Sequence, residues 1–204
     1  MSRSTPVREI ELKAVVEQWD GCRRRIKKAG GRLTFTGRME DRRYDTRQRA
    51  LARRDHVLRV RVYYRSNGRV TSSIDWKGAT EFEDGFKIRE EISVAVGPPQ
   101  DITALVQQLG YIVTSVMERQ IFQYQLEGAI VRFERYPRMD DLVEVEGPPV
   151  SIERAIKVLA IPREAFTSDR LLDFVQRFEA RSGRRAALCA AELSNRTRTR
   201  GADA

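Results

Sequence analysis

Several residue types on which common enzymes depend are scarce in this 204-residue chain. The two cysteines, Cys22 and Cys189, match neither a disulfide framework nor the Cys/His spacing of a zinc site. His56 is the only histidine and stands in a charged stretch, so histidine catalysis is disfavoured. No apolar run approaches the ~18 residues of a membrane span, and Met1–Pro6 is too polar for a signal peptide. The sequence therefore predicts a soluble cytoplasmic protein with no membrane partner.

Two motifs of phosphate and acyl chemistry are also missing. There is no GxxxxGK(S/T) phosphate loop and no GxSxG nucleophile elbow, so neither of those modes of catalysis is available. Charge, in contrast, is abundant. Charged residues make up 33% of the chain, its net charge is +9, and 32 of the 38 basic residues are arginine. Arginine is the planar, permanently charged donor suited to phosphate, although a GC-rich genome also tends to encode it.

Part of the positive charge lies at the C-terminal end. From residue 181 to residue 204 there are six arginines against two acidic residues. We therefore predict a domain over residues 1–180 and a basic, flexible tail over residues 181–204. Such a tail is either simply solvated or able to contact nucleic acid, polyphosphate or another polyanion. The sequence does not reveal the oligomeric state.

Hydrophobic periodicity and turn signals predict about eight strands and four helices. Hairpin-like spacing, with Asn67-Gly68 as the strongest turn signal, favours a largely antiparallel sheet. Helices are expected at 17–30, 101–109, 151–159 and 170–179. Strands are expected at 7–16, 32–36, 40–45, 57–64, 70–76, 86–96, 115–126, 130–135 and 142–146, the second and third being short pieces.

Charges sort by strand along one face of this sheet. Because side chains alternate across a strand, Glu9 and Glu11 share a face, as do Glu144 and Glu146 and the basic pair formed by Arg59 and Arg61. Two carboxylates ~5 Å apart repel by ~3 kcal/mol at an effective dielectric near 20. Hard carboxylate oxygens suit Mg²⁺ or Mn²⁺, and arginine pairs suit phosphate. The surface fits a metal–polyphosphate ligand, or else it is an ordinary solvated sheet face.

If eight strands close on themselves, this charged face becomes the interior. A closed eight-stranded barrel has room for side chains or one small ligand. Its apolar faces would then point outward and be covered by the helices. The predicted fold class is thus α+β, a closed eight-stranded antiparallel barrel with a charged interior and helices packed outside.

Six segments in order resemble the motifs of one family. Glu9–Lys13 resembles an ExExK signature, and the later segments resemble YFDT, LRxR, xKG, RxE and a closing ExE; they are Tyr44–Thr46, Leu58–Arg61, Trp76–Gly78, Arg89–Glu91 and Glu144–Glu146. Over residues 7 to about 178 the chain resembles the CYTH superfamily of triphosphate tunnel metalloenzymes. This superfamily includes class IV adenylyl cyclases, thiamine triphosphatases and inorganic triphosphatases.

The resemblance implies a set of site residues. The residues implied to hold Mg²⁺ or Mn²⁺ are Glu9, Glu11, Glu134, Glu144 and Glu146. Those implied to bind a triphosphate are Lys13, Arg59, Arg61, Lys77, Arg89, Arg119 and Arg170. Glu11 and Lys13 are the catalytic candidates, Lys13 being a possible base if neighbouring cations depress its pKa. The chain departs from the family pattern at Met117, at Ser93 and over residues 138–141.

Three functions follow from these expectations. The first is metal-dependent hydrolysis of inorganic triphosphate, thiamine triphosphate or a nucleoside triphosphate. The second is conversion of ATP to cyclic AMP and pyrophosphate, although the sequence shows no clear adenine pocket. The third is a polyphosphate- or nucleotide-binding module without turnover.

Overall fold

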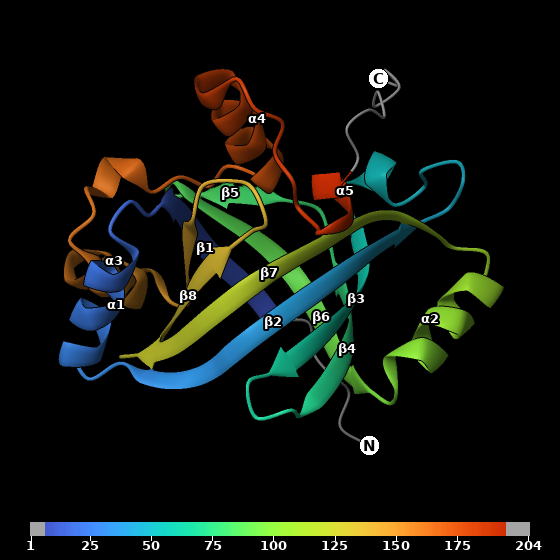
Figure 1. The fold of residues 1–204 in the computed structure, drawn as a ribbon, viewed down its shortest axis with the longest axis horizontal. Coiled ribbons are helices and arrows are strands. Elements are labelled where there is room, and N and C mark those ends of the chain that lie inside the picture. Colours follow the sequence, from blue (N-terminus) through green and yellow to red (C-terminus); the bar gives the residue numbers. More distant parts are fainter. Residues whose placement is uncertain (1–6, 195–204) are drawn as a thin grey trace.

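The computed structural model describes residues 7–194, and its centre is a closed barrel of eight antiparallel strands (Figure 1). Around the ring the strands are β1 (Val7–Val15), β9 (Leu142–Glu146), β8 (Ala129–Arg135), β7 (Ile112–Leu126), β2 (Arg32–Asp45), β3 (Val57–Arg65), β4 (Val70–Lys77) and β6 (Phe86–Val96). Pairing of β6 with β1 closes the ring, and the short β5 (Glu81–Glu83) forms a hairpin with the start of β6. The predicted fold class is confirmed.

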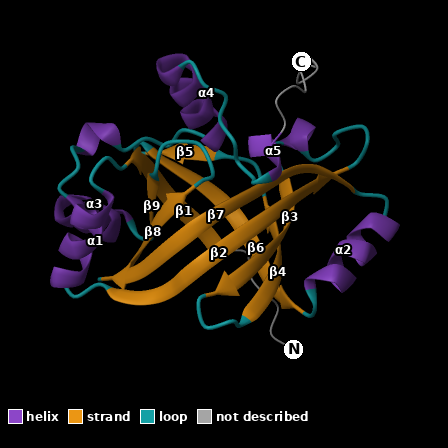
Figure 2. Cartoon of the chain, viewed as in Figure 1, coloured by secondary structure: helices purple, strands orange, loops and turns teal. Residues whose placement is uncertain are grey.

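Helices lie outside the barrel (Figure 2). They are α1 (Trp19–Lys28), α2 (Pro99–Gln108), α3 (Pro149–Leu159), α4 (Leu171–Ser182) and α5 (Ala191–Ser194), with 3-10 turns η1 (Ala52–Arg54) and η2 (Arg163–Ala165). No helix within residues 7–194 is long and apolar enough to cross a membrane. Residues 1–6, which the sequence analysis found too polar for a signal peptide, lie outside the described residues.

The apolar core sits between the barrel wall and these helices. Ile26 of α1 and Ile152 of α3 pack with Phe133 and Val145, which point outward from β8 and β9. On another side of the barrel, α2 inserts Val106 into a separate apolar cluster. Since alternate residues of each strand face opposite ways, this outward apolar face leaves the polar residues of the same strands pointing inward. The alternation within each strand therefore gives a barrel with a polar interior and an apolar outer face, the reverse of the usual arrangement.

The two short pieces expected at 32–36 and 40–45 form one 14-residue strand, β2. The intervening Gly37 has φ 150°, and an added Cβ would lie 2.0 Å from the carbonyl oxygen of Tyr64. Glycine therefore lets β2 continue through a point where the backbone of β3 comes very close.

The chain packs against the barrel beyond residue 180. Phe174 of α4 and Leu188 share an apolar cluster with Met117 and Leu142 at one end of the barrel. The Leu188 carbonyl accepts a 2.7 Å hydrogen bond from the backbone N–H of Glu118, at the part of β7 that extends past its pairing with β8. The packed chain thus continues to Cys189, further than the expected boundary at residue 180. The rest of the predicted tail, residues 195–204, lies outside the described residues.

Candidate functional site

Charged side chains from every barrel strand face the enclosed lumen. The register places Glu11 opposite both Lys87 and Glu146, and Glu9 opposite Arg89. Within residues 7–194 the charged lumen positions are nearly balanced in sign. The acidic ones are Glu9, Glu11, Asp41, Asp75, Glu91, Glu134, Glu144 and Glu146, and the basic ones are Lys13, Arg43, Arg59, Arg61, Lys77, Lys87, Arg89, Arg119 and Arg132.

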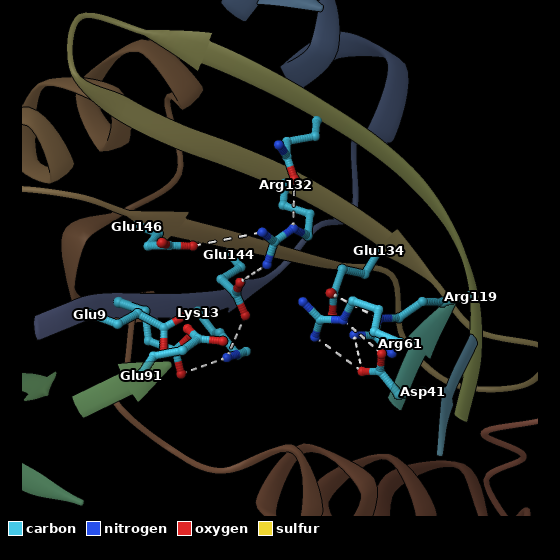
Figure 3. A network of polar contacts seen from close by, with 12 residues as sticks. Glu9, Lys13, Asp41, Arg61, Glu91, Arg119, Arg132, Glu134, Glu144 and Glu146 are labelled. Atoms are coloured by element: carbon cyan, nitrogen blue, oxygen red, sulfur yellow. Dashed lines mark hydrogen bonds and ion pairs between the residues drawn. The ribbon is translucent and has the colours of Figure 1, made fainter. Parts of the chain in front are cut away.

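These residues form two groups on facing walls. Three strands lie between β1 and β2 in either direction around the ring, and three lie between β9 and β3, so each pair lies on opposite sides of the lumen. The acidic group consists of Glu9, Glu11, Glu144 and Glu146 on β1 and β9. The arginine group consists of Arg43, Arg59, Arg61 and Arg119 on β2, β3 and β7. Figure 3 shows members of both groups, each with its own ion pairs.

Cations hold two members of the acidic group in place. Glu11 Oε1 accepts a 2.9 Å hydrogen bond from Lys13 Nζ and a second bond from Lys87. Glu144 forms a 2.6 Å ion pair with Lys13 and also pairs with Arg132. Burial raises the pKa of both carboxyls, but the cations outweigh burial, so the pKa of Glu11 is well below its usual value and that of Glu144 is about 2. Both carboxylates are ionised near neutral pH.

The other two members carry excess negative charge. Burial, opposed by Lys77 and reinforced by the neighbouring carboxylates of Glu11, Glu91 and Glu146, raises the pKa of Glu9 to about 7. Burial likewise raises the pKa of Glu146, whose nearest cation is Arg132 at 3.7 Å. Carboxylates that resist ionisation because of like-charged neighbours gain stability when a cation comes between them.

Asp41 binds the arginine group together. Its carboxylate accepts hydrogen bonds of 2.7 and 3.1 Å from Arg61 and one of 3.0 Å from Arg119, and Arg59 lies 3.9 Å away. The carboxylate is 1% exposed. Burial raises the Asp41 pKa, but the three arginines overcome this and hold the pKa well below its usual value. One buried carboxylate therefore lies within 4.0 Å of three guanidinium groups.

Two donors of the arginine group lack partners. Arg43 Nε and Arg119 Nη1 are buried and have no hydrogen-bond partner within residues 7–194. Burial and the nearby Arg59 lower the pKa of Arg43 to about 10, opposed by the charge of Asp41. Buried donors without acceptors cost ~1–3 kcal/mol each, so they mark a place where an anion would be stabilised.

Lys13 does not meet the condition for a base. Burial lowers the pKa of its ammonium, but Glu11 and Glu144 outweigh burial and hold that pKa above its usual value. Lys13 therefore stays protonated, and its role is to hold negative charge. The condition under which Lys13 was a candidate base, a depressed pKa, is therefore not met.

Three residues implied by the resemblance lie apart from the groups assigned to them. Glu134 accepts bonds of 3.0 Å from Arg119 and 2.8 Å from Tyr136, so it lies with the arginine group rather than the acidic group. Arg89 donates to the backbone carbonyls of Gly78 and Asp55. Arg170 precedes α4, is 60% exposed and pairs with Asp55 at 3.3 Å, outside the lumen.

The remaining implied phosphate-binding residues lie inside. Lys77 pairs with Glu9 and, at 3.3 Å, with Glu91, and Arg59 donates to Asp75 at 2.8 Å. Ser93, a departure from the family pattern, donates at 2.7 Å to Asp75. Ser93 therefore binds the same carboxylate, Asp75, that pairs with Arg59 in the lumen.

Six lumen residues are not among the predicted site residues: Asp41, Arg43, Asp75, Lys87, Glu91 and Arg132. The last four lie on the charged faces already predicted from alternation and could have been included. Asp41 and Arg43 gave no signal, because Glu40 and Arg42 alternate with them and pair on the outer face at 2.7 Å. Both faces of that stretch are charged, so its inward face could not be recognised.

The acidic group fits a hard divalent cation in donor chemistry and in strand placement. Carboxylate oxygens are the ligands that Mg²⁺ and Mn²⁺ prefer, and Glu11 and Glu146 stand directly opposite each other on paired strands. In the described part of the chain, however, no three acidic, cysteine or histidine side chains converge on one point. Lys13 lies between Glu11 and Glu144 instead, 2.9 Å from the first carboxylate and 2.6 Å from the second.

A cavity of about 650 Å³ lies outside the lumen, between α1, the 160–167 segment and α4. Val15, Cys22, Arg25, Phe174 and Arg177 line it, and none of the charged lumen residues does. The cavity is therefore separate from the chemistry of the two charged groups.

Together, the fold and the site define an antiparallel barrel that encloses a cationic wall and an acidic wall. The family model of the CYTH domain matches residues 7–147, and the chain belongs to the CYTH family. No curated protein gives a significant sequence match.

Solved structures share the fold at low sequence identity. A proposed adenylate cyclase from Vibrio parahaemolyticus is 15% identical with a TM-score of 0.69, covering 82% of this chain and 97% of its own. A Pyrococcus horikoshii protein is 20% identical with a TM-score of 0.68, covering 83% and 98%. A Hippeastrum protein with a dominant triphosphatase activity is 16% identical with a TM-score of 0.59, covering 90% and 99%.

Proposed function

We propose that this chain is a metal-dependent phosphohydrolase that acts on a triphosphate compound bound in the barrel lumen. The observation that carries the proposal is the unpartnered pair of buried donors, Arg43 Nε and Arg119 Nη1, on the wall that faces the acidic group. A chain of phosphates supplies acceptors for both donors. Family membership and the triphosphatase activity of the Hippeastrum protein support hydrolysis as the first choice.

Each wall has a role in this proposal. Arg59, Arg61 and Arg119 bind the phosphate oxygens, and their fixed guanidinium groups stabilise the charge that develops during in-line attack. Protonated Lys13 lies between Glu11 and Glu144 and adds a further positive charge. Mg²⁺ or Mn²⁺ held by the acidic group would neutralise phosphate oxygens and activate the attacking water.

The test is a substrate panel with the purified chain. Tripolyphosphate, thiamine triphosphate and ATP are each supplied with Mg²⁺ or Mn²⁺, and orthophosphate, pyrophosphate and cyclic AMP are measured. We expect orthophosphate from at least one compound, and no release after chelation of the divalent ion. Cyclic AMP with pyrophosphate as the products would instead establish a cyclase, and tight binding without any product would establish a binding module.

Variants then test the site itself. Glu11→Gln and Arg61→Lys should each lower kcat/KM by about 100-fold, because each removes a charge or a bidentate contact from the lumen. The matched controls are Glu90→Gln, on the exposed outer face of β6, and Arg24→Lys, exposed on α1. Full activity in both lumen variants, with their melting temperatures unchanged, would show that the reaction takes place elsewhere.

A further inference from the structure

The surface around α2 carries almost no charge. Asp101 is the only charged residue between Ile92 and Met117, although charged residues make up 33% of the chain. The other three helices of ten residues or more, α1, α3 and α4, each carry at least three charged residues, and α2 carries one. The outward side of α2 therefore differs from that of the other long helices.

Exposed apolar side chains gather in the same stretch. Within residues 7–194, five of the eleven exposed large apolar side chains lie between residues 94 and 113; they are Val94, Leu105, Leu109, Ile112 and Val113. The other six come from six different elements and each is alone on its element; they are Leu33, Val70, Phe82, Val150, Leu172 and Leu193. Single exposed apolar residues are ordinary, whereas a group of them marks an interaction surface. We call the group of five the α2 patch.

The α2 patch surrounds one buried cluster. Val106 of α2 packs with Tyr44 of the barrel wall. Val113 stands opposite Tyr44 on paired strands, and Val94 stands opposite Ile74, which packs against the same cluster. Because directly paired residues lie on the same face of a sheet, both valines point outward beside α2. The members of the patch are therefore neighbours on the outer surface.

The apolar stripe of α2 is wider than the barrel wall that covers it. Ile102 and Val106, one turn apart, pack against the wall. Leu105 and the C-cap residue Leu109, also one turn apart, lie on one flank of the helix and are 55% and 67% exposed. α2 packs against β3 and β4, and Figure 1 shows it on the opposite side of the barrel from α1 and α3. Covering both leucines therefore takes a second molecule.

The charge of the chain indicates which molecule this is. Two copies of a chain with net charge +9 repel each other, and near a twofold axis each side chain meets its own equivalent or a close neighbour. A contact between copies therefore needs a surface without charge, which the α2 patch supplies. A partner of opposite charge would bind the arginine-rich surface instead. A helix that lies on a membrane carries Lys or Arg on its polar face, and α2 has neither.

The polar residues beside the leucines suit a contact between two copies. Asp101 lies four residues before Leu105 and Gln108 three residues after it, so both adjoin this leucine on the helix surface. In an antiparallel pair of α2 helices, the first turn of one copy meets the last turn of the other. The Gln108 amide of one copy can then donate to the Asp101 carboxylate of the other, which gives the one charge of α2 a partner.

We propose that the α2 patch forms a twofold-symmetric dimer of this chain, in which the two α2 helices pack antiparallel and Leu105 and Leu109 of each copy contact those of the other. This inference does not depend on the proposed function. The centre of the contact is one short helix from each copy, so we expect a Kd of ~1–100 µM.

Sedimentation equilibrium of the full chain, from about 1 µM to about 500 µM, measures the association. In the first pair of variants, Leu109→Glu changes the patch, and Leu172→Glu changes an apolar side chain on α4 that is similarly exposed, at 57%. The second pair, Gln108→Glu and Gln107→Glu, makes the same change at two adjacent exposed positions. Gln107 is two residues from each leucine and therefore about 200° around the helix from both. Thermal unfolding checks that all four variants fold.

We expect Leu109→Glu to raise the dimer Kd about 100-fold, because the change occurs twice in each dimer and places a carboxylate in the contact. Gln108→Glu should raise Kd about tenfold, since its carboxylate would face Asp101 of the other copy. Both controls should stay within about twofold of the unaltered chain. Each substitution lowers the net positive charge, which by itself favours association, so a weaker dimer identifies the contact. Added salt should strengthen the dimer of the unaltered chain by screening the repulsion between copies.

Three results would overturn the inference. A chain that stays monomeric over the whole concentration range has no such dimer. Equal changes in Kd for Gln107→Glu and Gln108→Glu, or for Leu172→Glu and Leu109→Glu, would show that the copies meet elsewhere. Binding of a monomeric chain to vesicles of anionic phospholipid, lost in Leu109→Glu, would make the patch a membrane-binding surface instead.

Discussion

The substitution Asp41→Asn removes a carboxylate that contacts Arg59, Arg61 and Arg119. Asparagine keeps the size of the side chain but places a neutral group among the three arginines, of which Arg59 keeps its ion pair with Asp75 and Arg119 keeps its ion pair with Glu134. Each guanidinium–carboxylate attraction is ~4 kcal/mol for charges 4 Å apart at an effective dielectric of 20. Removal of one partner from a buried ion pair typically costs ~3–5 kcal/mol after the remaining groups adjust. We therefore expect the variant to be less stable than the unaltered protein and to be stabilised by a bound anion.

Thermal unfolding measures both properties. For a chain of this size a loss of 1 kcal/mol lowers Tm by ~2–4 °C, so Asp41→Asn should melt roughly 6–20 °C below the unaltered protein. Tripolyphosphate should raise the Tm of the variant by more than it raises that of the unaltered protein, because the arginine group has gained a net positive charge. The control is Asp20→Asn, whose exposed pairing with Arg23 at 3.4 Å should contribute less than ~1 kcal/mol.

An Asp41→Asn protein that melts at the same temperature as the unaltered protein, and whose Tm tripolyphosphate raises by no more, would contradict this prediction. Such a result would mean that the three arginines do not depend on Asp41 and do not form one anion-binding group. A lower Tm together with a smaller tripolyphosphate-induced increase in Tm would also contradict the prediction. It would mean that Asp41 helps to bind the ligand rather than occupying its place among the arginines.

Three further predictions concern stability. Gly37→Ala should destabilise the barrel by about 3 kcal/mol or more in urea unfolding, because its Cβ would collide with the Tyr64 carbonyl oxygen; an unchanged midpoint would contradict the close approach of β2 and β3. Asp45→Ala should cost about 1–3 kcal/mol by leaving three backbone N–H groups without acceptors. Burial raises the pKa of Asp45, but those N–H groups hold it below its usual value, so its stabilisation is present above pH ~3.9 and is lost as pH falls through the folded pKa. The difference in stability between the Asp45→Ala variant and the unaltered protein should therefore shrink as the pH falls, which acid unfolding curves would measure. Leu188→Ala should cost about 2–4 kcal/mol in the same urea assay, and no loss would mean that residues 186–190 do not stabilise the barrel end.

Most of the fold was predictable from alternation. Glu9 and Glu11, Arg59 and Arg61, and Glu144 and Glu146 each occupy one face of a strand whose other face is apolar, and the barrel places all six inside. Position along a strand is a local property, so the sequence records it directly. The segment at residues 186–190 was not predictable, because its order comes from contact with Met117 and Glu118, about 70 residues earlier in the chain.

The site was predictable in residue type but less so in pairing. The sequence shows which side chains carry charge, whereas the protonation of Lys13 depends on having both Glu11 and Glu144 within reach. The position of Glu134 beside Arg119 likewise depends on register between β7 and β8. Such pairings arise only after the ring of strands closes, and composition or periodicity does not encode them.

The pairing of Glu11 and Glu144 with lysine and arginine has a consequence for the order of events. A phosphate that attracts Lys13 and Arg132 loosens their hold on these two carboxylates, and a metal ion that attracts the carboxylates loosens the same cations in return. We therefore expect the metal ion and the phosphate to increase each other's affinity, so that the lumen binds the two cooperatively.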